Sequence, residues 1–196
     1  MKTRKLKPEE LPTYIARFAE LKPNKDAYAS LDSVPPEAYE MVAARDIYVL
    51  MGPQPAPSVN PAATRPAVEG APGTTVYIVK CPPGNGPALH SHNHTRETFM
   101  ALDTPFEVRV NDTGTLATLL KPFDLFAVPP GVTRAFRNLG DRDGHLLVMV
   151  QGPAEAVLND ISLPPSVGEE VARRYGKGAR AGLEKIGMAF DIEVEV

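Results

Sequence analysis

Hydrophobic and polar positions change their spacing twice along this chain of 196 residues. Near the N-terminus, Leu11, Ile15 and Phe18 recur three or four residues apart among charged side chains, which predicts an amphipathic helix over residues 8–22. A short helix over residues 36–44 and a strand over residues 46–51 are expected next. Six prolines between residues 53 and 72 then predict a loop or extended linker over residues 52–74.

From about residue 75 the pattern changes to short hydrophobic runs separated by turn residues. Strands are expected at 75–80, 89–94, 97–102, 106–110, 115–119, 125–128, 133–138 and 145–150. Short strands at such regular spacing are typical of a β-sandwich or a small barrel. The high proline content, 21 residues, also argues against a mostly helical chain.

After residue 151 the spacing becomes helical again. Ser166 and Glu169 form a capping-box pattern, which predicts a helix that runs to Lys185 and that Gly176, Gly178 and Gly182 weaken or break in two. Residues 190–196 alternate between hydrophobic and polar, as expected of an edge strand that pairs with the barrel or across a dimer. The predicted organisation is an N-terminal helical extension (1–51), a linker (52–74), a barrel (75–151) and a C-terminal helix and strand (152–196).

Composition narrows the classes of partner. The net charge of −3 and the pI near 5.8 offer no basic surface for nucleic acid or an anionic membrane. No apolar stretch reaches transmembrane length, and we expect a cytoplasmic protein. Cys81 is the only cysteine of the chain, which excludes an internal disulfide and a cluster of thiolate ligands, and we interpret it as a buried, unreactive thiol.

Three of the four histidines and one carboxylate lie between His90 and Glu97. Imidazole and carboxylate groups together are ligands of first-row divalent metals, and two histidines with one carboxylate suit non-haem Fe(II). If residues 90–94 form a strand, His90, His92 and His94 lie on one face, and Glu97 comes from the next strand. The alternative is a solvated hairpin end in which the histidines bind nothing.

Two motifs carry a resemblance to a known family. Gly84, His90-Ser91-His92 and Glu97, at this spacing, resemble the first motif of the cupin superfamily. The segment Pro129–Asn138 resembles the second motif, and the separation of the two motifs is normal for that family. Two motifs in the right order, within a region of short strands, are a much more specific signal than either one alone.

The resemblance covers roughly residues 75–151. It implies a mostly β fold, a double-stranded β-helix or jelly-roll barrel, here with helical flanks at both ends. It also implies a metal ion held by His90, His92 and Glu97 inside the mouth of the barrel, with a fourth ligand from the second motif.

That fourth position holds Arg134 where the family has histidine. A guanidinium stays protonated and has no lone pair for a metal, so three outcomes are open. The three remaining ligands form a site with open positions, and Arg134 holds a substrate carboxylate or phosphate beside it. Alternatively, Arg134 pairs with Glu97 and displaces the metal, or His94 or His145 takes the missing place.

The leading hypothesis is therefore a metal-dependent cupin, an enzyme resembling a non-haem Fe(II) dioxygenase, that acts on a small anionic organic substrate. Glu97 and Arg134 are the expected catalytic residues, and Zn, Ni and Mn are alternatives to iron. The rival hypothesis is a small-ligand-binding or regulatory cupin without metal, in which Arg134 pairs with Glu97. A homodimer is expected from the edge strands and from the resemblance.

Overall fold

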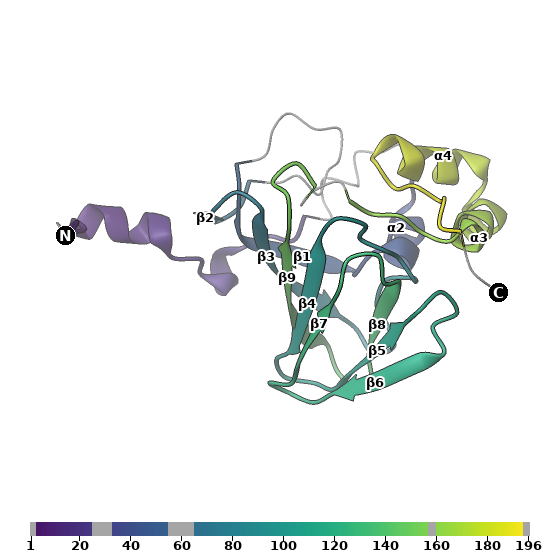
Figure 1. Cartoon of the computed structure of the whole chain (residues 1–196), viewed down its shortest axis with the longest axis horizontal. Helices are drawn as coiled ribbons and strands as arrows, with labels where there is room; N and C mark the ends of the chain where they lie inside the picture. Colours follow the sequence, from purple (N-terminus) through teal and green to yellow (C-terminus); the bar gives the residue numbers. More distant parts are fainter. Residues whose placement is uncertain (1–2, 25–32, 55–64, 157–159, 194–196) are drawn as a thin grey trace.

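The computed structural model describes residues 3–24, 33–54, 65–156 and 160–193. It contains two β-sheets, one with the strand order β2-β1-β3-β9-β4-β7 and one with the order β6-β5-β8 (Figure 1). The strands are β1 (Asp46–Gly52), β2 (Val68–Glu69), β3 (Thr74–Cys81), β4 (Arg96–Ala101), β5 (Phe106–Val110), β6 (Leu116–Leu120), β7 (Leu125–Val128), β8 (Arg134–Asn138) and β9 (Gly144–Gln151).

The two sheets share one hydrophobic core because inward-facing residues alternate along the strands. On β9, for example, Leu146, Val148 and Val150 are buried, and the residues between them are half-buried. Phe136 of β8 packs edge-on against Phe99 of β4 and Phe106 of β5, with ring centroids 5.2 and 6.2 Å apart. The predicted mostly β, double-stranded β-helix fold is confirmed.

Helices from both ends of the chain form a second hydrophobic core at one side of the barrel (Figure 1). They are α2 (Pro36–Val42), α3 (Pro165–Tyr175) and α4 (Lys177–Lys185). The predicted C-terminal helix is indeed divided, because Gly176 adopts a φ of 91°, in the left-handed region that favours glycine. The capping-box prediction was wrong: Pro164 is the N-cap, and no side chain caps the helix.

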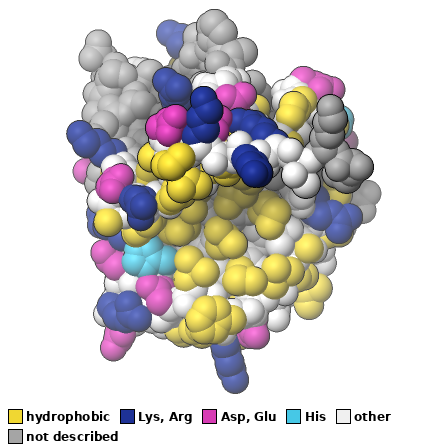
Figure 2. Space-filling view, turned by 90° about the vertical axis from the view of Figure 1, so that its left-hand side faces the viewer, with side chains coloured by type: hydrophobic (Ala, Val, Ile, Leu, Met, Phe, Trp, Pro, Cys, Tyr) yellow, Lys and Arg dark blue, Asp and Glu magenta, His cyan; other side chains and the backbone are white. Residues whose placement is uncertain are grey.

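The predicted continuous helix over residues 8–22 was also wrong. The chain instead forms two short 3-10 helices, η1 (Pro8–Tyr14) and η2 (Phe18–Glu20), with Pro12 inside the first. Proline lacks a backbone N–H and clashes with the preceding turn, which disfavours a long α-helix here. This segment projects from the barrel (Figure 1), and hydrophobic side chains gather on the face of the molecule where it lies (Figure 2).

Two predicted strands are not regular strands. Residues 89–94 make isolated bridges at His90 and Ser91 and then bend, so the strand parity expected for His94 does not hold. At the C-terminus, residues 190–193 form no strand, and Phe190 is buried in the helical core. Residues 194–196 of that predicted strand, and residues 55–64 of the proline-rich segment, lie outside the described residues.

Candidate metal centre

The backbone around the histidines is held from both sides. On one side, His90 and Arg134 exchange two backbone hydrogen bonds of 2.9 and 2.8 Å, and the N–H of Gly131 donates to the carbonyl of His92. On the other side, Ser91 and Ser162 exchange bonds of 2.8 and 3.0 Å. The segment is therefore fixed by the second motif and by the chain beyond β9, without being a full strand of either sheet.

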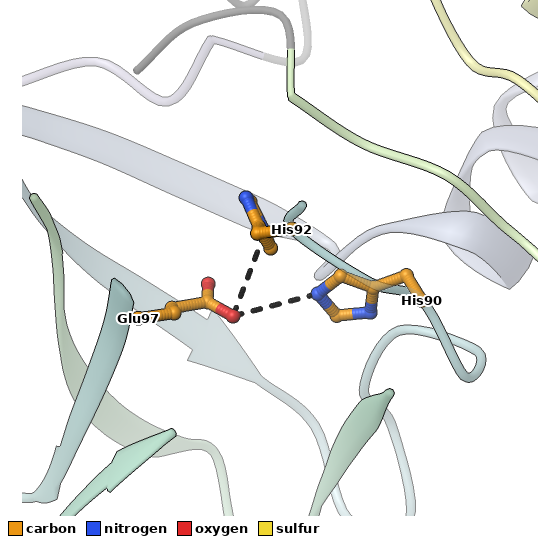
Figure 3. Close-up of side chains that lie close together, drawn as sticks. All are labelled: His90, His92 and Glu97. Carbon is orange, nitrogen blue, oxygen red and sulfur yellow. Dashed lines mark ion pairs between the residues drawn. The ribbon is translucent and has the colours of Figure 1, made fainter. Parts of the chain in front are cut away.

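His90, His92 and Glu97 converge at this point, with Glu97 on β4 (Figure 3). The Nε2 atoms of His90 and His92 lie 3.5 and 3.6 Å from Oε2 of Glu97, and all three side chains are buried. Two donor atoms that each lie about 2.0–2.2 Å from one metal ion, with an angle of about 90–109° between the two bonds, are about 3.0–3.5 Å apart. The two histidine–Glu97 separations lie at or just above the upper end of this range, and the three donor atoms all lie within 4.8 Å of one another, so small side-chain shifts bring them around one first-row metal ion.

Hydrogen bonds at the far side of each ring set which nitrogen faces Glu97. Nδ1 of His90 lies 2.9 Å from the carbonyl oxygen of Ala88, so it must be the donor. Nδ1 of His92 lies 3.2 Å from Oγ1 of Thr95, whose hydroxyl already donates to a carboxylate, so His92 is the donor there too. In the neutral rings Nε2 then carries the lone pair, as in a metal-ligating histidine.

Asp160 is the carboxylate behind Thr95. Its Oδ2 accepts bonds from the N–H groups of His94 and Thr95, both 2.8 Å, and from Oγ1 of Thr95 at 3.0 Å. Its Oδ1 accepts from the N–H of Asn93 at 3.0 Å. Burial raises the pKa of Asp160, but these hydrogen bonds outweigh it and hold the pKa below its ordinary value. An ionised Asp160 thus orders the loop that carries His92.

Electrostatics favour ionised Glu97 and neutral His92. Burial lowers the pKa of His92 to about 4, which leaves the ring uncharged at neutral pH. Burial raises the pKa of Glu97, but His92, His90 and Arg134 together lower it to about 2. Oε2 of Glu97 is buried and has no hydrogen-bond partner among the described residues. A buried carboxylate oxygen without a partner, beside the lone pairs of two imidazole nitrogens, is an arrangement that a bound cation would satisfy. The residues present therefore fit a metal ion.

Arg134 lies next to this group but is not positioned as a substrate clamp. Its side chain is fully buried, Nε is 3.6 Å from Oε2 of Glu97, and Nη2 donates to the carbonyl of Pro129 at 3.2 Å. The contact with Glu97 is a single one beyond hydrogen-bond length, not a bidentate fork. The guanidinium does not line the cavity described below, so it reaches Glu97 rather than the cavity.

An apolar cavity of about 130 Å³ borders the three ligands. Its wall combines residues of the barrel core with residues of the helical core, so α2 and the chain after β9 close the mouth of the barrel. Apolar examples are Ile47, Val79, Phe136, Val148 and Met188. Polar groups on the wall include the three ligands, Asp160 and Asn24. Concave, mainly apolar sites with a few converging polar groups are typical of small-molecule sites.

The other histidines do not complete the site. His94 is exposed, and His145 makes a 2.6 Å contact with Asp103. Cys81 is buried, and burial raises the pKa of its thiol to about 12, which fits the unreactive thiol expected from the sequence. Sequence reasoning missed Asp160 and Asn24, because both come from outside the two motifs and no local pattern marks them.

Residues 77–150 match the family described as the cupin domain. This chain carries a cupin domain. The comparison with curated proteins finds no match. Within this region the first motif carries the three candidate ligands, on the bridged segment and on β4, and the second motif carries Arg134 on β8.

Solved structures that are similar to this chain match part of it at low identity. One is the cupin domain of Schizosaccharomyces pombe Cnp3, with 22% identity, a TM-score of 0.40, and coverage of 44% of this chain and 61% of that one. Another is the DMSP lyase DddQ from Ruegeria pomeroyi, with 23% identity, a TM-score of 0.41, and coverage of 54% and 46%. The cupin chain thus spans less than two thirds of either structure.

Proposed function

We propose that this protein is a metal-dependent cupin enzyme in which His90, His92 and Glu97 bind one divalent cation, with Fe(II) favoured. The observation that carries the proposal is the buried, unpartnered Oε2 of Glu97 between two histidine Nε2 atoms at 3.5 and 3.6 Å. Two histidines and one carboxylate suit non-haem Fe(II), whereas Zn, Ni and Mn are alternatives that the same ligands accept.

We further propose a reaction of the dioxygenase type on a small organic substrate in the adjoining cavity. A metal held by three protein ligands retains open positions and supplies Lewis acidity and oxygen activation. The chain contributes the rest: the apolar wall excludes water, the Asp160–Thr95–His92 series orients a ligand ring, and Arg134 stabilises ionised Glu97 until a metal ion competes with it for that carboxylate.

Arg134 also favours an anionic substrate, although it does not touch the cavity. Its positive charge formally cancels that of Glu97 across 3.6 Å, so the charge of a bound divalent cation stays uncompensated by the protein groups next to it. An anionic ligand group would balance that charge in the buried site. In this proposal Arg134 acts through Glu97 and the local field, as a positioning residue.

A second candidate is a small-ligand-binding cupin without metal. The fully buried Arg134 supports it, because its Nε lies as close to Oε2 of Glu97 as the histidine nitrogens do. In this case the ion pair alone would neutralise Glu97, and the cavity would bind a ligand without chemistry.

Metal content separates the two functions. The chain is purified without a metal-binding tag, reconstituted with Fe(II) without oxygen, and its metal is quantified by mass spectrometry. We expect about one metal ion per chain in the wild type and in His94→Ala, a matched control that removes an exposed histidine, and almost none in His92→Ala. An equally metal-free wild type would refute the enzyme and favour the ligand-binding module.

Location and assembly stay predictions. None of the helices in the described residues is long and apolar enough to cross a membrane. We propose a homodimer, which the exposed hydrophobic side chains of the N-terminal segment support.

A further inference from the structure

One polar side chain on the cavity wall, that of Asn24, makes no hydrogen bond within the described part of the protein. Asn24 is 7% exposed, and within the described part of the chain neither Oδ1 nor Nδ2 has a hydrogen-bond partner. Buried amide groups are nearly always satisfied, because removing them from water without a partner costs free energy. An unsatisfied group of this kind calls for a physical explanation.

The position of Asn24 is fixed by its backbone and not by its amide. Its N–H donates to the carbonyl of Ile47 in β1 at 2.9 Å, which ties the N-terminal segment to the barrel beside the cavity. Asn24 is one of the residues that line the cavity beside His90, His92 and Glu97. Its carboxamide, a paired donor and acceptor, is buried at this otherwise mainly apolar wall.

Apart from the atoms of the three candidate ligands that face the metal position, the other polar groups on this wall are already engaged, Tyr39 and Tyr77 included. Nδ1 of each histidine is hydrogen-bonded, and Asp160 accepts from three backbone N–H groups and a hydroxyl. Neutral, unengaged donors and acceptors at a cavity wall are the groups that select a ligand, because an analogue that cannot pair with them leaves them unsatisfied.

We infer that Asn24 is the recognition residue of this cavity, and that the ligand is a compact, mainly apolar molecule with a neutral hydroxyl, carbonyl or amide group that pairs with its carboxamide. The size follows from the cavity volume of about 130 Å³, since an engineered apolar cavity of about 150 Å³ accommodates benzene. Only one part of this inference rests on the proposed function, namely that the other end of the ligand lies next to a metal ion.

A neutral probe pair tests Asn24 without depending on the metal. Cyclopentane and cyclopentanol share a ring, are no larger than about benzene, and differ by one hydroxyl. Their dissociation constants are measured by calorimetry on the metal-loaded and on the chelator-treated wild type, on Asn24→Leu, which is similar in size and apolar, and on Asn24→Ala, which leaves the cavity open.

We expect the preference for the alcohol, the ratio of the cyclopentane to the cyclopentanol dissociation constant, to fall at least about tenfold in both variants, the value of one hydrogen bond. Asn24→Leu should melt no earlier than the wild type, because a residue with a structural role would lose stability when replaced. An unchanged ratio, a lower melting temperature of Asn24→Leu, or no binding of either probe to the wild type would overturn the inference.

The same preparations separate this inference from the proposed function. Asn24→Leu should retain as much metal as the wild type, because Asn24 is not among the converging ligands. A metal-free wild type that still shows the Asn24-dependent preference would refute the enzyme and keep the recognition residue. A metal-loaded wild type with an unchanged ratio in Asn24→Leu would refute the recognition residue alone.

Discussion

The replacement of Asp160 by asparagine should weaken both the fold and the metal centre. The carboxylate accepts four hydrogen bonds, three from backbone N–H groups of residues 93–95 and one from the hydroxyl of Thr95. In Asp160→Asn the single carbonyl oxygen can take the three contacts of Oδ2, and the new amide then points a donor at the N–H of Asn93. At least one bond is lost, and the others lose their charge assistance.

The size of the effect follows from those bonds. Hydrogen bonds to charged groups contribute about 1.5–3 kcal/mol each, so we expect a loss of about 2–4 kcal/mol in the free energy of unfolding. For a chain of this length the melting temperature should fall by roughly 5–15 °C. The Thr95 hydroxyl that holds His92 loses its anchor as well, and loss of such an outer-shell contact weakens metal affinity about 10–100-fold.

The assay combines thermal unfolding with metal titration on Asp160→Asn and on Asp141→Asn. The control removes the same charge from an exposed turn residue. Asp141→Asn should melt and bind metal like the wild type. If the two variants melt at the same temperature and bind metal equally, the carboxylate of Asp160 does not order the histidine loop, and the reasoning fails.

The remaining predictions test neighbouring parts of the site. Thr95→Val should keep the fold but lower metal affinity about 10–100-fold, and an unchanged affinity would show that the hydroxyl does not orient His92. The pKa of Asp160 is lower in the folded protein, so its stabilisation is complete above the unfolded value of about 3.9 and is lost as the pH falls through the folded value. The stability gap between wild type and Asp160→Asn should therefore shrink below about pH 4 in acid-unfolding curves, and a gap that widens would contradict this assignment. Arg134→Met should raise metal affinity at least about tenfold by removing a cation next to Glu97, whereas weaker metal binding would indicate that Arg134 supports the ligand set. Light scattering at micromolar concentration should give the mass of a dimer, and a monomer mass would refute the proposed assembly.

The barrel was predictable because its signals are local. Period-two alternation and turn residues located β5 and β7 at their observed bounds, and β4, β8 and β9 within one residue. The prediction of a continuous N-terminal helix was wrong because it rested on hydrophobic spacing alone. Pro12 lies within this segment, and its effect on the backbone outweighs a helical pattern of hydrophobic residues. The strand through His94 failed because isolated bridges to Arg134 and Ser162, and hydrogen bonds to Asp160, hold that segment in place of a regular strand ladder, and these partners are distant in sequence.

By itself, the sequence determined the cupin barrel, the convergence of His90, His92 and Glu97, and the presence of an arginine, Arg134, at the position where the family usually has a fourth metal ligand. The first two follow from the resemblance of two short motifs, at their fixed spacing, to the cupin superfamily, and the third from the residue type at one position of the second motif. Only the tertiary structure decided that Arg134 contacts Glu97 behind the site, that Asp160 anchors the histidine loop, and that Asn24 reaches the cavity. Each of those contacts joins segments far apart in the chain: Arg134 and Glu97 come from different strands of the barrel, and Asp160 and Asn24 come from the chain on either side of it.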